Sequence, residues 1–321
     1  MINSFPRVDV VLLSWNRVDS LLETIKNISN QVNILVEMWI IDQGSEPDQL
    51  KALKDGLFNF PTAHLIENTQ NTGVPAGRNQ GMKLGNADYI ICLDNDAIFE
   101  SEHAIEKAVT KLQQEPDTAI LGFKVNNYFS RQLELSSWVY PRPLLKSADF
   151  EFMTARFCGA GHAIRRTSLQ QTDYYDEALF FYWEELDLAY QMINLGFTIT
   201  YFPEVVILHK TAPEKRVSWR GDRYYYLVRN GLYIQWKYYR SQTKFIARSL
   251  GYLVKGAINL MPQKAIRGIK DALKMVSGLK NTQAPLLSAQ SQAYIKKYDT
   301  QPRGSLLSRI KNELIAKLPE H

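Results

Sequence analysis

The stretch YIICLDNDAIFE, residues 89–100, runs through five apolar residues, drops into Asp94-Asn95-Asp96, and then turns apolar again. The apolar run predicts a buried β-strand, which places the three polar residues at the strand's end. Carboxylate oxygens at such a position suit Mg²⁺ or Mn²⁺, which bind a few carboxylates together with phosphate oxygens and water. The alternative is a turn or a helix cap, because Asp and Asn favour both.

The rest of residues 1–210 alternates between strand and helix patterns. Four more short apolar runs rich in β-forming residues predict strands at 8–15, 34–42, 63–68 and 118–125. Segments of helical length and spacing lie between strands, at 18–31, 75–85 and 102–116. This alternation predicts an α/β fold with a mostly parallel sheet flanked by helices, and ligands at the carboxyl ends of the strands.

The pattern loosens over residues 126–152, where we expect an excursion or flap. The sheet is expected to resume within 152–166 and 197–210, with a helix from about Trp183 between them. No strand pattern follows residue 210.

The composition indicates a globular protein, with 321 residues of which 45% are hydrophobic and 22% charged. The two cysteines, Cys92 and Cys158, have neither a metal-binding spacing nor the number needed for a disulfide framework, so a reducing, cytoplasmic setting is predicted. The N-terminal residues do not resemble a signal peptide, and no apolar window is long enough to predict a transmembrane helix.

Charge divides the chain into two predicted domains. Residues 1–210 carry 17 Lys and Arg against 27 Asp and Glu, whereas residues 211–321 carry 21 against 6. The second part mixes aromatic, aliphatic and basic residues at helical spacing. Such helices either lie on an anionic membrane surface, peripherally at the cytoplasmic face, or pack on the first domain or on a second subunit as a homo-oligomer. No nucleic-acid-binding motif is present, so no such partner is predicted.

Six motifs in order give the first domain a family resemblance: VVLLSWNR (10–17), IIDQGS (40–45), NTGVPAGRNQG (71–81), LDNDA (93–97), FFYWEELDLAYQM (180–192) and VVILHK (205–210). Over residues 8–210 the sequence resembles glycosyltransferase family two, and most closely its rhamnosyltransferase-like bacterial members. The resemblance implies the GT-A fold and an inverting transfer, dependent on Mn²⁺ or Mg²⁺, of a sugar from a nucleotide-diphospho sugar to a glycan or lipid-linked acceptor. It further implies UDP- or dTDP-linked donors, with rhamnose or galactofuranose as first choices, and a role in assembling a bacterial surface polysaccharide.

The resemblance also assigns the site residues. It implies that the nucleobase, ribose and phosphates of the donor are held by the following residues: Leu13, Trp15, Asn16, Arg17, Asp42, Arg78, Asp94 and Asn95. Gly73 leaves room for a close approach of the backbone. Asp96 and His209 are implied as metal ligands. The alternatives are that Gly73 serves only a turn, that Arg78 is a surface residue, and that His209 is a histidine with protein partners alone.

The catalytic base is predicted in the helix that starts near Trp183. A helical wheel places Glu184 and Asp187 on a polar stripe, and Glu185 within the apolar arc. Burial there raises the pKa of a carboxyl toward the working pH, so Glu185 is the predicted base. The alternative is that all three acids only favour the positive end of the helix.

Two departures from the family pattern bear on function. Gln43 stands where the family has Asn, and the Glu-Asp pair that carries the family's base is Glu184-Glu185 here. The second departure leaves a catalytically silent nucleotide-sugar-binding or scaffolding protein as a rival hypothesis. A sugar-phosphate nucleotidyltransferase is the other rival, although LLSWNRVDS (12–20) lacks the glycine-rich loop that such an enzyme needs.

Overall fold

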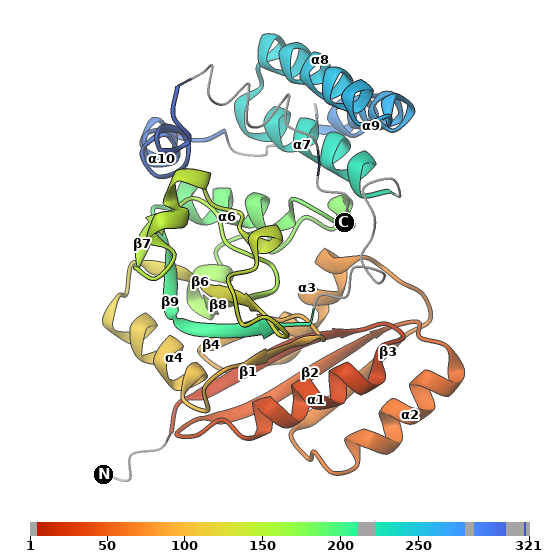
Figure 1. Ribbon diagram of the computed structural model, residues 1–321, viewed down its shortest axis with the longest axis vertical. Coiled ribbons are helices and arrows are strands. Elements are labelled where there is room, and N and C mark those ends of the chain that lie inside the picture. Colours follow the sequence, from red (N-terminus) through yellow and green to blue (C-terminus); the bar gives the residue numbers. More distant parts are fainter. Residues whose placement is uncertain (1–4, 211–221, 280–285, 306–317, 319–321) are drawn as a thin grey trace.

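The computed structural model describes residues 5–210, 222–279, 286–305 and Leu318. Within these residues one sheet runs in the order β3-β2-β1-β4-β8-β6-β9-β5, and β7 pairs with β9 beside this path. Helices cover both faces of the sheet, and the helices of the C-terminal region stack beyond α6 (Figure 1).

Four parallel neighbours form the N-terminal half of the sheet: β1 (Arg7–Ser14), β2 (Leu35–Gln43), β3 (Ala63–Asn68) and β4 (Tyr89–Leu93). Alternate residues of β1 enter the cores on opposite faces, with Val10 and Leu12 on one side and Val11 on the other. The register pairs Ser14 with Asp42, so the polar residues that follow β1 and β2 meet at one edge of the sheet. Residues 94–96 follow β4 to the same edge, because β4 is the other neighbour of β1.

Five further strands complete the sheet: β5 (Ala97–Phe99), β6 (Thr118–Asn127), β7 (Phe152–Thr154), β8 (Gly161–Arg165) and β9 (Thr198–His209). β8 is antiparallel to β4 and β6, and β5 and β7 are antiparallel to β9. The remaining strands of the described chain all point one way, so the prediction of a mostly parallel sheet is confirmed. β5 was not predicted, because three residues are too few to show a strand period.

Six helices belong to the part before residue 210: α1 (Val18–Ser29), α2 (Pro47–Leu57), α3 (Val74–Leu84), α4 (Ala104–Gln114), α5 (Arg166–Leu169) and α6 (Glu184–Asn194). Between the end of β6 and the start of β7, the expected excursion at 126–152 contains two 3₁₀ turns, at Leu135–Ser137 and Arg142–Ser147. A third 3₁₀ turn, Glu177–Leu179, precedes α6.

The described part of the chain after residue 210 is helical: α7 (Tyr224–Tyr239), α8 (Gln242–Ile258), α9 (Pro262–Gly278), α10 (Ala289–Ile295), a π-helical turn (Lys296–Thr300) and a 3₁₀ turn (Gln301–Arg303). One apolar cluster joins Leu188 of α6 to Ile234 and Tyr238 of α7 and to Ile295 of α10. The two predicted domains therefore share a core, and the boundary at residue 210 stays a prediction. Parts of the predicted second domain, at 211–221, 280–285, 306–317 and 319–321, lie outside the described residues.

Among the described helices, none is both long enough and apolar enough to span a bilayer.

A buried ion cluster holds the C-terminal segment against the first domain. The carboxylate of Asp299 accepts hydrogen bonds from Arg156 Nε at 2.7 Å and from Arg303 Nη2 at 2.7 Å. Only 8% of the Asp299 side chain is exposed. Burial by itself would raise the pKa of Asp299, but the two guanidinium groups lower it below its ordinary value.

We expect Asp299→Asn to lower the free energy of unfolding near pH 7 by about 3 kcal/mol, because it removes the anion between two buried cations. A depressed pKa contributes stability above the pKa of the unfolded state, about 3.9, and this contribution is lost as the pH falls through the folded-state value. The difference between wild type and variant should therefore narrow toward pH 3 in urea titrations. Asp117→Asn, at an exposed position, is the control and should change little at either pH. A difference that stays the same in acid would contradict the assignment.

Candidate functional site

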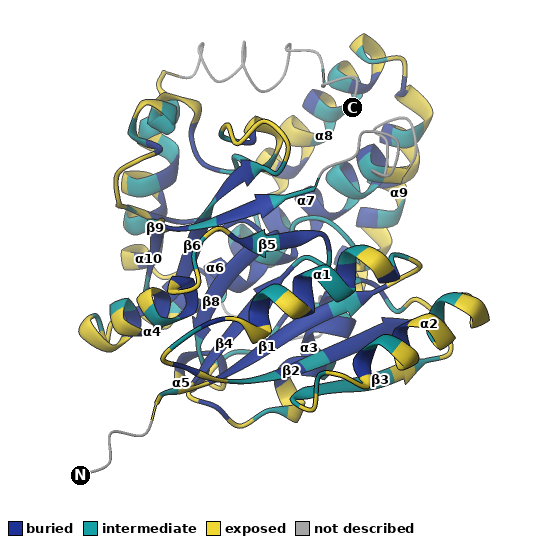
Figure 2. Ribbon diagram, turned by 60° about the horizontal axis from the view of Figure 1, so that its bottom comes forward, coloured by how far each residue is buried: buried dark blue, intermediate teal, exposed yellow. Residues whose placement is uncertain are grey.

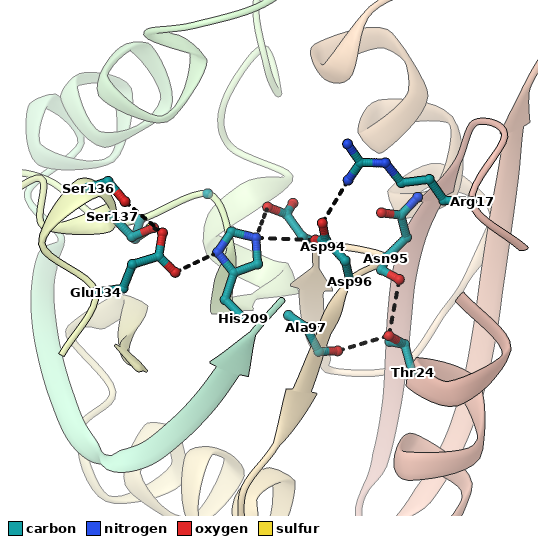
Figure 3. Close-up of polar contacts among 12 residues, drawn as sticks. Arg17, Thr24, Asp94, Asn95, Asp96, Ala97, Glu134, Ser136, Ser137 and His209 are labelled. Carbon is teal, nitrogen blue, oxygen red and sulfur yellow. Dashed lines mark hydrogen bonds and ion pairs between the residues drawn. The ribbon is translucent and has the colours of Figure 1, made fainter. Parts of the chain in front are cut away.

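Three side chains converge at the edge where β1, β2 and β4 end. Asp94, Asp96 and His209 can each offer one ligand atom, with these atoms all within 4.8 Å of one another (Figure 3). The unpredicted strand β5 produces this convergence, because it starts directly after Asp96 and pairs Ala97 with His209 at the end of β9. The sequence prediction that residues 94–96 and His209 lie together is thus matched by their placement.

His209 lies between carboxylates on both sides of its ring. Its Nε2 is 3.2 Å from Asp96 Oδ1 and 3.9 Å from Asp94 Oδ2, and its Nδ1 is 3.0 Å from Glu134 Oε2. Burial alone would lower the pKa of His209, but its bonds with Asp96 and Glu134 raise it to about 10. Burial alone would raise the pKa of Asp96, but His209 and Arg17 lower it below its ordinary value.

Glu134 was not predicted as a site residue. It lies in the 126–152 excursion, is buried, and accepts hydrogen bonds from the hydroxyls of Ser136 and Ser137 at 2.8 and 2.9 Å (Figure 3). Its carboxylate therefore fixes one ring nitrogen of His209 and leaves Nε2 directed at the aspartates. No sequence signal marks it, since a lone Glu before two serines in a loosely patterned segment is common.

The donor set fits a divalent ion such as Mn²⁺ or Mg²⁺. Two carboxylates and an imidazole whose second nitrogen is held by a carboxylate form an arrangement found around protein-bound metals. Binding would require neutral His209, so a proton would leave as the ion enters. Arg17 Nη1 contacts the other oxygen of Asp96 at 2.7 Å, which puts a second positive group against the same carboxylate.

Arg78 connects the cluster of Asp94, Asp96 and His209 to α6. Only 4% of its side chain is exposed, and its Nη2 donates to Gly159 O at 2.7 Å and to Asp94 Oδ1 at 3.1 Å. Its Nη1 lies 3.3 Å from Glu185 Oε1. The alternative of a surface arginine is therefore wrong, and Arg78 lies between one predicted donor-binding residue and the predicted base.

The helical wheel was wrong about relative burial in α6. Glu184 and Asp187 are 3% and 0% exposed, whereas the Glu185 side chain keeps 20% of its surface exposed. The wheel failed because α7 covers the polar stripe, where Lys237 Nζ lies 2.8 Å from Asp187 Oδ1 and Tyr238 OH donates to the same oxygen.

Both glutamates at the start of α6 have raised pKa values. Burial raises the pKa of Glu185, although Arg78 opposes the shift. Burial together with the neighbouring Glu185 raises the pKa of Glu184. Glu185 is thus the acid that contacts both Arg78 and the open side of the site, while Glu184 is enclosed.

The segment that leads into α6 has a strained backbone. Phe180, Tyr182 and Trp183 have φ values of 61°, 75° and 80°, in the left-handed region that bulky residues seldom adopt. Buried Asn230 of α7 holds this segment. Its Nδ2 donates hydrogen bonds to the carbonyl oxygens of Leu179, Phe181 and Tyr182, at 3.0, 2.9 and 2.7 Å. Sequence analysis missed Asn230, since a single asparagine inside a helix has no pattern.

Asp42 and Asn16 lie at the rim formed by β1 and β2. Asp42 is fully buried, and its carboxylate accepts from the backbone amides of Gly44 and Ser45 at 3.1 and 2.9 Å. Asn16 bridges the same loops, since its amide donates to Ser45 Oγ and its Oδ1 accepts from the amide of Glu46. Asp42 thus shapes the loop, and its predicted contact with the donor stays a prediction.

The remaining residues that are predicted to bind the donor differ in their exposure to solvent. Trp15 is 54% exposed beside Arg17, and Leu13 and Asn95 are half-buried. Gly73 has φ 89°, and a Cβ there would lie 2.5 Å from Phe180 O, so its missing side chain accommodates the strained segment. The ligand contacts of these residues stay predictions.

The fold of this chain is shared with solved structures. A mannosyltransferase of Pyrobaculum calidifontis, in complex with GDP-Man and Mn²⁺, superposes with a TM-score of 0.59 at 16% identity, covering 97% of this chain and 88% of that one. GalNAc-T7 with UDP, GalNAc and Mn²⁺ gives a TM-score of 0.62 at 13% identity, covering 88% of this chain and 59% of the other. The fold is therefore the GT-A fold, as predicted.

Sequence comparison gives the family. Residues 9–173, just over half of the chain, match the family model Glycosyl transferase family 2, and the chain belongs to this family. The uncharacterized glycosyltransferase YwdF of Bacillus subtilis is 28% identical over 185 residues, which cover 56% of this chain and 65% of YwdF. Chondroitin synthase of Escherichia coli is 25% identical over 178 residues, which cover 53% of this chain and 26% of the synthase. This chain thus matches less than two thirds of either relative. The rhamnosyltransferase-like subtype stays a prediction.

We expect Glu134→Gln to weaken Mn²⁺ binding about 10- to 100-fold, because the carboxylate that orients the ligating histidine is lost. Mn²⁺ titration followed by electron paramagnetic resonance, with and without UDP, measures the affinity. Glu100→Gln is the matched control, since Glu100 is exposed and follows β5 closely. Equal affinity in wild type and Glu134→Gln would show that Glu134 does not position His209.

We expect Asn230→Asp to lower the free energy of unfolding by about 3 kcal/mol, because a buried carboxylate would face carbonyl oxygens instead of donating to them. Backbone amides of residues 179–186 should exchange hydrogen faster than in wild type. Exchange in β1 and β4 should quicken only as far as the loss in the global free energy of unfolding requires. Asn59→Asp, at an exposed position, is the control. Unchanged exchange in residues 179–186 would contradict the bracing role of Asn230.

Proposed function

We propose that this protein is an inverting, metal-dependent glycosyltransferase that moves a sugar from a nucleotide-diphospho sugar to a glycan or lipid-linked acceptor. The observation that supports this most directly is the run of contacts from His209 to Asp94, from Asp94 to Arg78 and from Arg78 to Glu185, with Asp96 also beside His209. It sets a metal-ligand cluster and a carboxylate with a raised pKa on either side of one buried cation.

The donor is proposed to lie along the edge where β1, β2 and β4 end. Arg17 and Arg78 offer planar guanidinium groups suited to phosphate oxygens. Asp96 and His209 would hold Mn²⁺ or Mg²⁺, which when bound neutralises charge on the departing diphosphate. Asp94 is proposed at the ribose, where its 38% exposed side chain remains accessible.

Glu185 is proposed as the general base. Its carboxylate takes the proton of an acceptor hydroxyl while that oxygen forms a bond to the anomeric carbon. The bond from this carbon to the diphosphate oxygen breaks at the same time, and the nucleoside diphosphate leaves with the electron pair. A single displacement of this kind inverts the anomeric configuration. Arg78 would keep Glu185 ionised, and the raised pKa gives it the basicity to accept the proton.

The donor and acceptor belong to the same proposal. The solved neighbours bind GDP-Man and UDP, which supports a nucleotide-sugar donor for this chain. A UDP- or dTDP-linked sugar, with rhamnose or galactofuranose as first candidates, and a role in bacterial surface polysaccharide synthesis at the cytoplasmic side remain our proposals. The relatives include a putative colanic acid biosynthesis transferase, WcaA of Escherichia coli, which is 33% identical over 92 residues, 28% of this chain and 33% of WcaA.

A catalytically silent nucleotide-sugar-binding protein is the second candidate. The glutamate in place of the family's usual aspartate at position 185 favours it. The contact of Glu185 with Arg78 argues the other way, because the longer side chain still reaches the site.

We expect the protein to release free nucleoside diphosphate from one of a panel of UDP-, dTDP- and GDP-sugars in the presence of Mn²⁺, and EDTA should abolish this release. In the same assay with an acceptor, Glu185→Gln should lower kcat by about 10²- to 10⁴-fold through loss of proton abstraction, with a small change in donor KM. Glu184→Gln is the matched control and should retain kcat within about tenfold of wild type.

Retention of wild-type kcat by Glu185→Gln together with loss of activity in Glu184→Gln would overturn the assignment of the base. Donor-dependent thermal stabilisation without any turnover across the panel would favour the silent binding protein.

A further inference from the structure

Among the residues that the structure describes, the outer face of α8 carries an apolar stripe with no packing partner. Four aliphatic residues repeat at four-residue spacing and are exposed by 37–59%: Ile246, Leu250, Val254 and Ile258. Leu260, in the turn to α9, is exposed by 81%. Figure 2 shows exposed residues along both α8 and α9. Because one helical turn is about 3.6 residues, the four positions form a band along one side of the helix.

The opposite face of α8 packs against neighbouring helices. Phe245, Gly251 and Gly256 are buried against the neighbouring helices. A Cβ at Gly256 would lie 3.1 Å from Ala265 Cβ of α9, so these two helices are in close contact. The apolar stripe is therefore the face left over after packing within the described residues.

Basic residues accompany the stripe. Residues 242–278 contain seven Lys and Arg against one acidic residue, Asp271. Asp271 is paired with Lys274 at 3.0 Å and accepts from Tyr225 OH. On α8, Lys244 and Arg248 stand over the rings of Tyr239 and Tyr252. On α9, exposed Arg267 and Lys270 lie between exposed Ile266 and Leu273 in the sequence.

We propose that the α8–α9 hairpin lies in the surface of an anionic lipid bilayer, with the stripe Ile246-Leu250-Val254-Ile258 in the acyl boundary and the basic residues at the headgroups. An exposed aliphatic band on a helix pair that carries seven Lys and Arg, with no acid on α8, matches the two requirements of an interfacial helix, apolar area and attraction to anionic lipid. The excess of Lys and Arg over residues 242–278 is complementary in charge to an anionic lipid surface, which favours this partner.

Other occupants fit the surface less well. A second copy packed on the same stripe by two-fold symmetry would bring the flanking cations of both copies together. A nucleic acid would meet the cations with its phosphates but leave the aliphatic band against a polar backbone. The inference rests on the exposed face of α8 and not on the proposed transfer reaction, so either can fail alone.

Co-sedimentation of the full chain with vesicles tests the proposal. We expect binding to vesicles that contain phosphatidylglycerol to be at least about tenfold tighter than to phosphatidylcholine vesicles, and to weaken as salt is added. The double variant Leu250→Asp/Val254→Asp should lose binding to phosphatidylglycerol vesicles by about tenfold or more. Phe58→Asp is the matched control, because Phe58 is 90% exposed at the end of α2 and should bind as wild type.

A second measurement requires no variant. Amides of α8 should gain protection from hydrogen exchange when phosphatidylglycerol vesicles are added to wild type, while those of α2 should not. The proposal is overturned if wild type does not bind these vesicles, or if the double variant binds like wild type. It is also overturned if the double variant converts a lipid-free dimer to a monomer in light scattering, which would assign the stripe to a second copy, or if duplex nucleic acid competes fully with the vesicles.

Discussion

The buried guanidinium of Arg78 is the interaction on which the site depends. Asp94 directly follows β4 and Glu185 belongs to α6, and the two carboxylates would repel each other in a medium of low dielectric. Arg78 contacts both and also Gly159 O, so it joins the start of α3 to β4, to the loop before β8 and to α6. Its neighbour in the helix, Asn79, pairs with the backbone of Tyr175 in both directions and fixes the ring over which Arg78 lies.

A second centre of charge, His209, works in the same way at the other end of the cluster. It receives Asp96 and Glu134 on its two ring nitrogens. Arg78, whose charge is permanent, and His209, which can give up its proton, thus stabilise carboxylates that would otherwise be too costly to bury. His209 would give up its proton if a metal ion bound there, whereas the charge of Arg78 is permanent.

Much of the fold was predictable because its signals are local and repeated. The strands of the parallel half are continuous apolar runs that end in polar residues, and the helices between them have regular spacing. The carboxylate pair and His209 could be located because each follows such a run. The contacts that finish the site arise from distant pairings with no period of their own. β5 is three residues long, Glu134 lies in an irregular excursion, and the burial of Asp187 depends on Lys237 some fifty positions later.

Asn230 has a consequence for how this chain could be recombined with others. The family match ends at residue 173, before the strained segment, and charge alone would suggest a cut at residue 210. Yet the three carbonyls that Asn230 holds belong to the segment that delivers the proposed base. α7 therefore braces the segment that leads to the proposed base. A chimera that exchanges tails should therefore keep α7, and also the segment around Asp299, which bonds to Arg156 of the first domain.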